Sequence, residues 1–255
     1  MSINFALILT ALTAFTGMVV AYDKFYLRKL TSDSDGCSNA ALNTTIDYSR
    51  SFFPVLLFVL VIRSFIFEPF RIPSGSMMPT LLQGDYIFVK KYSYGLRLPV
   101  IEKKIFDTGE PKRGDVVVFR LPSEPNINYI KRVIGLPGDE LVYERHRLTI
   151  NGEPVAVTRD ADHKTVSSTA RYIEQLGERK HAIFVTNPSH SMRDGTYRVP
   201  DGGYFMMGDN RDNSRDSRFI GTIPETYLVG EAVRIWMHMD GFEWPKWQRI
   251  GTKIK

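Results

Sequence analysis

The segment EPFRIPSGSMMPTLLQGD, residues 68–85, contains a serine whose setting could support nucleophilic catalysis. Its three prolines prevent a continuous helix, and Gly75 allows the backbone to turn tightly beside Ser76. Apolar side chains flank this short polar tip. A serine in a loop is most often only a turn residue, although loops also carry functional groups. Ser76 alone is therefore a candidate nucleophile that still needs a base.

A candidate base lies in the segment NYIKRVIGLPGD. The alternation expected of a strand places Lys131 on the same face as Val133, and places Arg132 on the opposite face with Ile130 and Ile134. A lysine on a half-exposed strand is ordinarily solvated. If Lys131 is buried instead, burial disfavours its charged form, lowers its pKa and makes it a general base near neutral pH. A serine hydroxyl needs such a base in order to attack.

Histidine is the alternative base, and the chain has five: His146, His163, His181, His190 and His238. None has the HExxH or paired-histidine spacing of a zinc site, and none has a cysteine companion after the second apolar run, so we expect no zinc. A Ser-His-Asp triad stays open, because its members meet in space rather than in sequence, but no GxSxG elbow supports one. We expect these histidines on the surface and in loops.

The acidic run GDNRDNSRDSR, residues 208–218, invites comparison with a calcium-binding loop. Such a loop needs glycine at its sixth position and glutamate at its twelfth, where this chain has Ser217 and Ile223. The run therefore predicts a structured polar turn, in which Asn and Asp side chains accept hydrogen bonds from backbone amides. We expect neither a metal nor a cofactor in this protein.

Together, these segments resemble the motif boxes of the bacterial type I signal peptidases. The matching segments, in chain order, are PSGSMMPTL (73–81), GDYIFVKKYSYG (84–95), RGDVVVF (113–119), YIKRVIGLPGD (129–139) and GDNRDNSRDSR (208–218). The resemblance runs from the second apolar run to Glu225. It implies a membrane-bound serine endopeptidase with a Ser/Lys dyad that cleaves signal peptides from exported preproteins without a cofactor.

The resemblance also implies roles for individual residues. Ser76 matches the nucleophile of the family and Lys131 matches its general base. Ser74 matches the serine whose hydroxyl, with the backbone N–H of Ser76, forms the oxyanion hole. Ser214 matches the residue that hydrogen-bonds and orients the lysine. Asp216 and Arg218 match a supporting ion pair.

The family accepts small side chains at the first and third positions before the cut, which implies two shallow apolar pockets. The candidates for the pocket walls are Phe70, Ile72, Leu81 and Ile130. Each of them could equally be an ordinary core residue. Some two-span members of the family carry a cysteine pair in an inserted region, whereas this chain has none there.

Two apolar runs precede these segments. Residues 3–22 contain no charged side chain and would span about 30 Å as a helix, the thickness of a bilayer core. A cleaved signal peptide is the weaker alternative, because the run lacks a basic start and a small-residue cleavage site. The second run, residues 51–68, is interrupted by Arg63 near its end, where a long side chain can reach the headgroups. A buried core helix is its alternative. We predict two transmembrane spans, residues 1–22 and 51–68.

The loop between the spans, residues 23–50, is expected in the cytoplasm, because it contains Lys24, Arg28, Lys29 and Arg50. The rest of the chain then lies on the extracytoplasmic, periplasmic face of the bacterial inner membrane, as a multi-pass protein. Cys37, the single cysteine, falls in this loop, so we expect an ordinary free thiol and no intramolecular disulfide.

After residue 70 the pattern changes to short strands, and we predict a mostly β catalytic domain of antiparallel sheets or a partly open barrel. The expected strands are residues 85–92, 115–120, 128–135 and 204–207. Asn151-Gly152 predicts a hairpin turn. We divide this part into a catalytic domain, residues 69–140 and 201–255, and an inserted accessory subdomain, residues 141–200.

Charge and aromatic residues bear on the partners. Residues 71–255 carry the whole net charge of +5, which favours anionic membrane lipid. No nucleic-acid motif accompanies this charge, so we expect no nucleic acid. Trp244 and Trp247 are candidates for contact with the membrane interface. The translocation machinery is a further candidate partner. A specialised Ser/Lys peptidase and a non-enzymatic, membrane-tethered β module remain the rival interpretations.

Overall fold

The computed structural model describes residues 5–27, 40–98, 104–161, 169–186, 193–239, 241, 244 and 246–255. They form two compact units: residues 1–67 with 96–106, and residues 68–95 with 107–255. The predictions for Arg28, Lys29, Cys37, His163 and His190 concern residues outside the described ranges.

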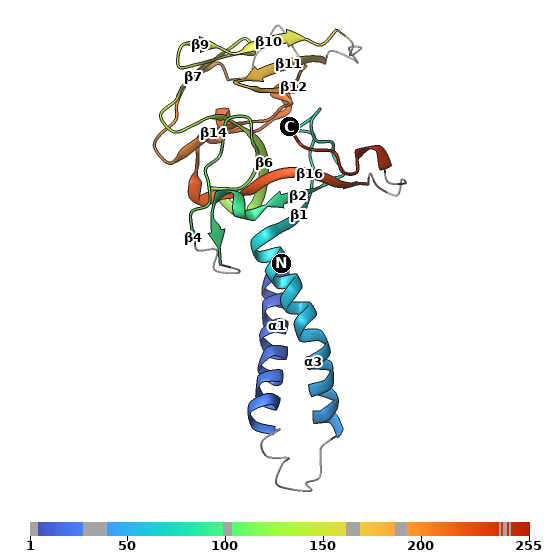
Figure 1. Cartoon of the computed structure of the whole chain (residues 1–255). Helices are drawn as coiled ribbons and strands as arrows, with labels where there is room; N and C mark the ends of the chain where they lie inside the picture. Colours follow the sequence, from blue (N-terminus) through green and yellow to red (C-terminus); the bar gives the residue numbers. More distant parts are fainter. Residues whose placement is uncertain are drawn as a thin grey trace. The chain divides into compact units, whose positions relative to one another are not determined.

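The first unit consists mainly of two long helices that pack side by side (Figure 1). Helix α1 covers Phe5–Tyr22 and continues into a π-helical turn, η1, at Asp23–Leu27. Helix α3 covers Ala40–Val61 and ends in a second such turn, η2, at Ile62–Ile66. A two-stranded ribbon, β3 (Leu96–Arg97) and β4 (Lys104–Phe106), completes the unit.

Both helices are long and apolar enough to cross a membrane. Many of their large apolar side chains are exposed, among them Phe15, Met18, Phe52 and Phe58. This is the reverse of a soluble bundle, which buries such side chains. Between the helices, Gly17 lies so close to the ring of Phe53 that a Cβ atom there would be 2.8 Å from the ring edge.

Helix α3 begins at Ala40 rather than at Ser51, where the apolar run begins. The early turns carry polar residues, including Arg50, which forms an ion pair with Asp23 at the end of α1. A helix is not limited to the apolar part of its sequence, because its backbone hydrogen bonds are satisfied within the helix itself.

The second unit is built on a seven-stranded sheet in the order β1-β2-β16-β5-β6-β14-β15. The strands are β1 (Phe67–Arg71), β2 (Asp85–Lys90), β5 (Val116–Leu121), β6 (Glu124–Gly135), β14 (Gly203–Met207), β15 (Ile223–Pro224) and β16 (Leu228–His238). The pairs from β2 to β15 are antiparallel, which confirms the predicted fold class. Five short helical segments lie between or after strands: η3 (Lys91–Tyr94), η4 (Arg211–Asn213), α4 (Ser217–Ile220), η5 (Glu225–Tyr227) and η6 (Trp247–Arg249).

Both faces of this sheet are covered, which explains the uninterrupted apolar sequence of β5. Val116 and Val118 belong to one buried cluster, whereas Val117 and Phe119 belong to another. Successive side chains of a strand point to opposite faces, so a strand covered on both sides needs apolar residues throughout.

The chain leaves this sheet after β6 and returns to it at β14. Between them, the strands β7 to β13 form two smaller sheets, which we call the accessory subdomain. One sheet has the order β13-β7-β8-β9, with β7 (Glu140–Glu144), β8 (Arg147–Ile150), β9 (Glu153–Pro154) and β13 (Gly195–Arg198). The other has the order β10-β11-β12, with β10 (Ala156–Arg159), β11 (Ala170–Leu176) and β12 (Arg179–Val185).

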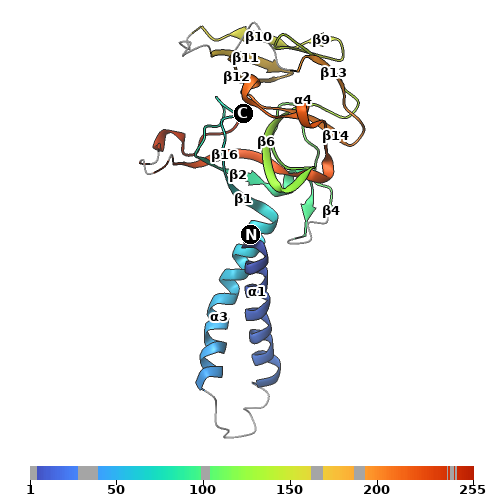
Figure 2. The ribbon, with the colours of Figure 1, turned by 180° about the vertical axis from the view of Figure 1, so that it is seen from behind.

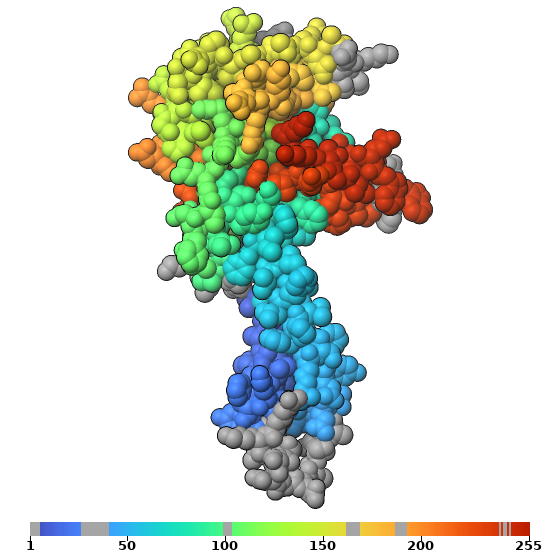
Figure 3. All heavy atoms as spheres, viewed as in Figure 1, coloured from blue at the N-terminus to red at the C-terminus, as the bar shows by residue number. Residues whose placement is uncertain are grey.

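Within the second unit, the sheet β10-β11-β12 lies at the end opposite to β1, as Figure 1 and the reverse view in Figure 2 both show. In the space-filling view the residues of this sheet, in yellow, form that end of the unit (Figure 3). The predicted hairpin joins β8 to β9, where Asn151 and Gly152 both have positive φ, as a two-residue turn of this type requires.

Candidate active site

Ser76 lies in the loop between β1 and β2, and the core of the second unit holds this loop firmly. The backbone N–H of Ile72 donates to the carbonyl of Asp85 at 2.8 Å, which closes the loop at its base. Met77 and Leu81 are fully buried and anchor the loop in the cluster beneath it. Ser76 itself is only 8% exposed. A fixed backbone gives the hydroxyl a defined position, as a nucleophile requires.

Lys131 reaches this serine from strand β6, with its Nζ atom 2.7 Å from Ser76 Oγ. The carbonyl of Ile130 accepts a second hydrogen bond from Nζ at 3.0 Å. The register pairs Lys131 with Val117, and Nζ lies 5.3 Å from the ring centroid of Tyr129. Lys131 therefore occupies the face of β6 that the alternation predicts.

The lysine is buried, with 4% of its surface exposed. The pKa of Lys131 is lowered from its ordinary value of 10.5 to about 8, mainly by burial and in smaller part by the nearby charge of Arg218. The carboxylates of Asp216 and Asp209 act in the opposite direction and limit the shift. An amine with this pKa is partly neutral at physiological pH, so it can accept the proton of a hydroxyl at 2.7 Å.

Ser74 lies beside the nucleophile, with its Oγ atom 3.4 Å from Ser76 Oγ. The structure thus brings together all three residues that the sequence places at the centre of the reaction. A hydroxyl at this position can donate a hydrogen bond to an oxygen that forms next to Ser76.

The polar run after β14 packs directly against the nucleophile loop. The backbone N–H of Asn210 donates to the carbonyl of Ser76 at 3.0 Å, and the Asn210 side chain donates to the carbonyl of Gly75 at 3.0 Å. A Cβ atom on Gly208 would lie 2.5 Å from the Ser76 carbonyl oxygen. These contacts show that the run fixes the position of Ser76 as well as the surroundings of Lys131.

Asp216 and Arg218 form the predicted ion pair, and both are buried. Asp216 also accepts a hydrogen bond from the backbone N–H of Gly208 at 3.0 Å, and Arg218 donates to the carbonyl of Arg211 at 2.6 Å. The pair therefore ties both ends of the polar run together.

Ser214 is buried close to Gly208, where a Cβ atom would lie 2.3 Å from Ser214 Oγ. Within the described part of the chain, this hydroxyl has no hydrogen-bond partner. The expected hydrogen bond to Lys131 is thus not formed here, where Nζ is engaged by Ser76 and the carbonyl of Ile130.

A buried charge network behind the site was not foreseen from the sequence. Arg132, on the opposite face of β6 from Lys131, donates two hydrogen bonds to Asp209, at 2.8 and 2.6 Å. Arg211 likewise donates two hydrogen bonds to the carboxylate of Glu174 in β11. Burial alone would raise the pKa of Glu174, but Arg211 and the nearby His181 bring it below its usual range. The only sequence signal is the density of Arg and Asp in the polar run.

The expectation that the histidines lie on the surface is wrong for three of them. His146, His181 and His238 are buried. Nε2 of His146 lies 2.7 Å from Asp212, and Nδ1 of His238 lies 2.8 Å from Asp85. A buried imidazole needs a polar partner, and these carboxylates provide one. In the described part of the chain these three histidines contact carboxylates and form no hydrogen bond with Ser76.

The four candidates for the pocket walls also come together. Ile72, Leu81 and Ile130 belong to one buried cluster, and Phe70 packs against its edge. The same cluster contains Met77, next to the nucleophile. These side chains lie in the core next to the nucleophile loop, where Ile72, Leu81 and Ile130 are buried and Phe70 is partly exposed, so their role as pocket walls stays a prediction.

Comparison with known proteins identifies the family of this chain. A family model described as "Signal peptidase, peptidase S26" matches residues 45–237. A protein from Pseudomonas fluorescens named "Signal peptidase I" is 45% identical, over 96% of this chain and 94% of that protein. Its namesake in Haemophilus influenzae is 30% identical, over 99% of this chain and 92% of that protein.

A solved structure of a signal peptidase I from Enterococcus faecalis V583 is 28% identical and covers 48% of this chain and 96% of that chain, with a TM-score of 0.32. The family match and the two relatives span most of the chain, including every segment that forms the site. The chain therefore belongs to the signal peptidase family S26, and it is a serine endopeptidase of that family.

Proposed function

We propose that the protein is a membrane-bound endopeptidase that removes signal peptides from exported preproteins by Ser/Lys acyl-enzyme catalysis. One observation carries the proposal: the buried amine of Lys131, with a pKa lowered to about 8, lies 2.7 Å from the hydroxyl of Ser76. A serine and a base at hydrogen-bond distance are the minimum equipment for acyl transfer.

In the first half of the reaction, neutral Lys131 takes the proton of Ser76 while Oγ attacks the carbonyl carbon of the scissile bond. The negative charge that develops on the carbonyl oxygen is stabilised by the backbone N–H of Ser76 and by the hydroxyl of Ser74, 3.4 Å from Ser76 Oγ. The protonated Lys131 then gives its proton to the leaving amine, and an ester on Ser76 remains.

In the second half, a water molecule loses a proton to Lys131 and attacks the ester, which releases the cut signal peptide and restores the hydroxyl. Ser214 and the Asp216–Arg218 pair hold the polar run in place around the lysine, and the two charges of the pair also act on the pKa of Lys131 in opposite directions. Ser214 would serve in this way by hydrogen-bonding Lys131 when Nζ moves away from Ser76 during the reaction.

The small side chains before the cut need a binding site next to Ser76. The apolar cluster next to the nucleophile loop contains Ile72, Leu81 and Ile130, and Phe70 packs against it. We assign to them the walls that receive the residues before the cut, which in a signal peptide are small.

The two apolar helices would hold the enzyme in the bacterial inner membrane as a multi-pass protein, with the catalytic domain on the periplasmic face. Ser76 follows Phe67 by nine residues, which extend at most about 30 Å, so the nucleophile stays near the bilayer. Trp244 and Trp247 are strongly exposed, which suits contact with anionic lipid beside the net positive charge. A contact with the translocation machinery would bring preproteins to this surface.

The test is to incubate the purified full-length protein in detergent with a preprotein and to sequence the new N-terminus of the product. The proposal predicts one cut at the signal-sequence junction. Cuts at many unrelated sites, or a product made equally by an enzyme preparation with Ser76 blocked, would contradict it. The variant Ser123→Ala, which changes an exposed serine in a turn, is the matched control.

A further inference from the structure

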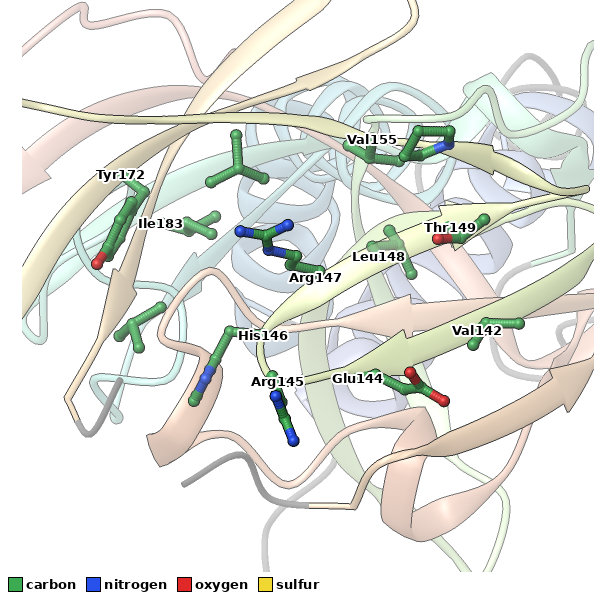
Figure 4. Close-up of a pocket in the computed structure, with 13 residues that line it drawn as sticks. Val142, Glu144, Arg145, His146, Arg147, Leu148, Thr149, Val155, Tyr172 and Ile183 are labelled. Atoms are coloured by element: carbon green, nitrogen blue, oxygen red, sulfur yellow. The ribbon is translucent and has the colours of Figure 1, made fainter. Parts of the chain in front are cut away.

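The accessory subdomain contains a cavity of about 1050 Å³ that the proposed reaction does not use. One wall is the β7–β8 hairpin and the other is the sheet β10-β11-β12, as Figure 4 shows. This volume is at the upper end of the range for ligand sites in proteins. A cavity of this size can receive several residues of an extended chain.

One wall of the cavity is apolar. Tyr172 and Ile183 are partners in the β11–β12 register, so their side chains lie next to each other on the same face of the sheet. Val157 of β10 and Val185 of β12 continue this wall. Val155 closes it where the chain passes from one sheet to the other.

The opposite wall is cationic. Arg145 and Arg147 stand at the tip of the β7–β8 hairpin, both are exposed, and Figure 4 shows Arg147 extending toward Ile183. Over the described ranges, neither guanidinium has an ion-pair partner. Glu144 is the one acidic residue of the lining. An anionic group between these walls would find two unpaired cations and an adjoining apolar surface.

His146 fixes the tip of the β7–β8 hairpin to the rest of the second unit. Its side chain is buried, with Nε2 2.7 Å from Asp212 Oδ1, and its backbone has the unusual φ of 64°. Its other ring nitrogen, Nδ1, is buried and has no hydrogen-bond partner in the part of the chain that the structure describes. Asp212 in turn accepts a hydrogen bond from the backbone N–H of Thr186 at 2.8 Å.

The same contact brings the cavity within reach of the nucleophile. Asp212 follows Asn210, whose N–H donates to the carbonyl of Ser76 at 3.0 Å. From Ser76 through Asn210 and Asp212 to His146, covalent geometry limits the distance to about 20 Å. A fully extended peptide covers that distance in about six residues.

The chain direction of a substrate decides which part of it can reach the cavity. In the proposed function the signal peptide remains in the bilayer through its apolar stretch, and β1 follows the second apolar helix directly. The sheet β10-β11-β12 lies at the end of the unit opposite to β1. Because β1 is joined to that helix, we place the β1 end of the unit next to the bilayer, and the residues after the cut then run from that end toward this sheet.

We propose that the cavity binds the mature part of the preprotein, at about the fourth to eighth residue after the cut, and that it favours a carboxylate side chain there through Arg145 and Arg147. This inference rests on the proposed function. It assigns to the accessory subdomain a specificity for the sequence after the cut, in addition to the small residues before it.

The test uses two preproteins that differ only by Glu in place of Gln at the sixth mature residue, with kcat/KM measured at physiological salt for the full-length protein. The wild type is expected to cut the acidic preprotein about threefold faster, the effect of one or two partly exposed ion pairs. In Arg147→Glu, and in Arg145→Glu with Arg147→Glu, the ratio should fall to one or below. Lys180→Glu makes the same charge change on the opposite face of β12 and should keep the wild-type ratio.

The outcomes separate this inference from the proposed function. If neither preprotein is cut at the junction, the proposed function fails. If the wild type cuts both preproteins equally, the proposed function is upheld, but the cavity does not select a carboxylate in the mature part. A preference that survives Arg147→Glu, or that Lys180→Glu abolishes equally, also overturns the inference, because the preference then comes from elsewhere or from overall charge.

Discussion

The guanidinium of Arg218 donates two hydrogen bonds of 2.8 Å to the carboxylate of Asp216. This buried pair lies in the polar run that contacts the nucleophile loop. Asp216 also accepts the backbone N–H of Gly208, next to the residues that bind the Ser76 carbonyl. The ion pair is thus a structural support for the nucleophile as well as an electrostatic neighbour of Lys131.

Replacing Asp216 by Asn should destabilise the protein by about 3–5 kcal/mol, because Arg218 is left buried with its charge uncompensated. Thermal unfolding of the full-length protein in detergent measures this as a lower Tm. Asp201→Asn removes an exposed carboxylate in a turn and should leave the Tm almost unchanged. Equal effects of the two substitutions would show that the buried pair does not support the fold.

Activity should rise with pH through a midpoint near 8, the value to which burial lowers the pKa of Lys131. Below this midpoint the amine is protonated and cannot take the proton of Ser76, so kcat should fall about tenfold per pH unit. Above it, kcat should level off until the protein unfolds. A midpoint near 10.5, or one near 6.5 traced to a histidine, would contradict a buried lysine as the base.

Asp216→Asn should also displace this profile. The carboxylate of Asp216 raises the pKa of Lys131 against the effect of burial, so its neutralisation should move the midpoint to lower pH. This second measurement distinguishes an electrostatic effect on the lysine from a general loss of folded protein, which lowers activity at every pH.

A methyl group on Gly208 should stop the reaction. A Cβ atom there would lie 2.3 Å from Ser214 Oγ and 2.5 Å from the Ser76 carbonyl oxygen, so the nucleophile loop has to shift. We expect Gly208→Ala to lower kcat at least a hundredfold, since small displacements of catalytic groups have effects of this size. At Gly195 the nearest atom to such a group is 3.7 Å away, so Gly195→Ala should be nearly as active as the wild type.

The orientation in the membrane can be tested independently of activity. Protease added to intact spheroplasts should digest the chain after about Phe67 and spare residues 23–50, because the basic loop is expected in the cytoplasm. A membrane-impermeant thiol reagent should label Cys37 only after the membrane is breached. Ready labelling of Cys37 from outside would reverse the topology.

Much of the fold was predictable because its signals are local. The strand β5 reads as VVVFRL and the hairpin as Asn151-Gly152, and both predictions need only the period of a strand and the preference of a turn. The face of β6 that carries Lys131 follows from the same alternation. Helix α3 begins earlier than predicted, because composition marks the apolar part of a helix and not its polar first turns.

The site was predictable only in part. Composition and spacing suggested a serine and a lysine, and the resemblance to a family joined them. The partners of the buried histidines could not be found this way, because His146 and Asp212 are far apart in sequence and meet only through the packing of the accessory subdomain. The role of Asn210 in holding the Ser76 carbonyl is equally a backbone contact with no sequence pattern.

The most direct test of the dyad compares Ser76→Ala, Lys131→Ala and the double variant with the wild type in preprotein cleavage at pH 9, beside the control Lys180→Ala. We expect each single variant to lose at least about 10⁴-fold in kcat/KM with an unchanged Tm or a higher one. We also expect the double variant to be no worse than either single one, because the two residues act as one unit. Normal turnover by Ser76→Ala or by Lys131→Ala would show that Ser76 and Lys131 are not the nucleophile and the base.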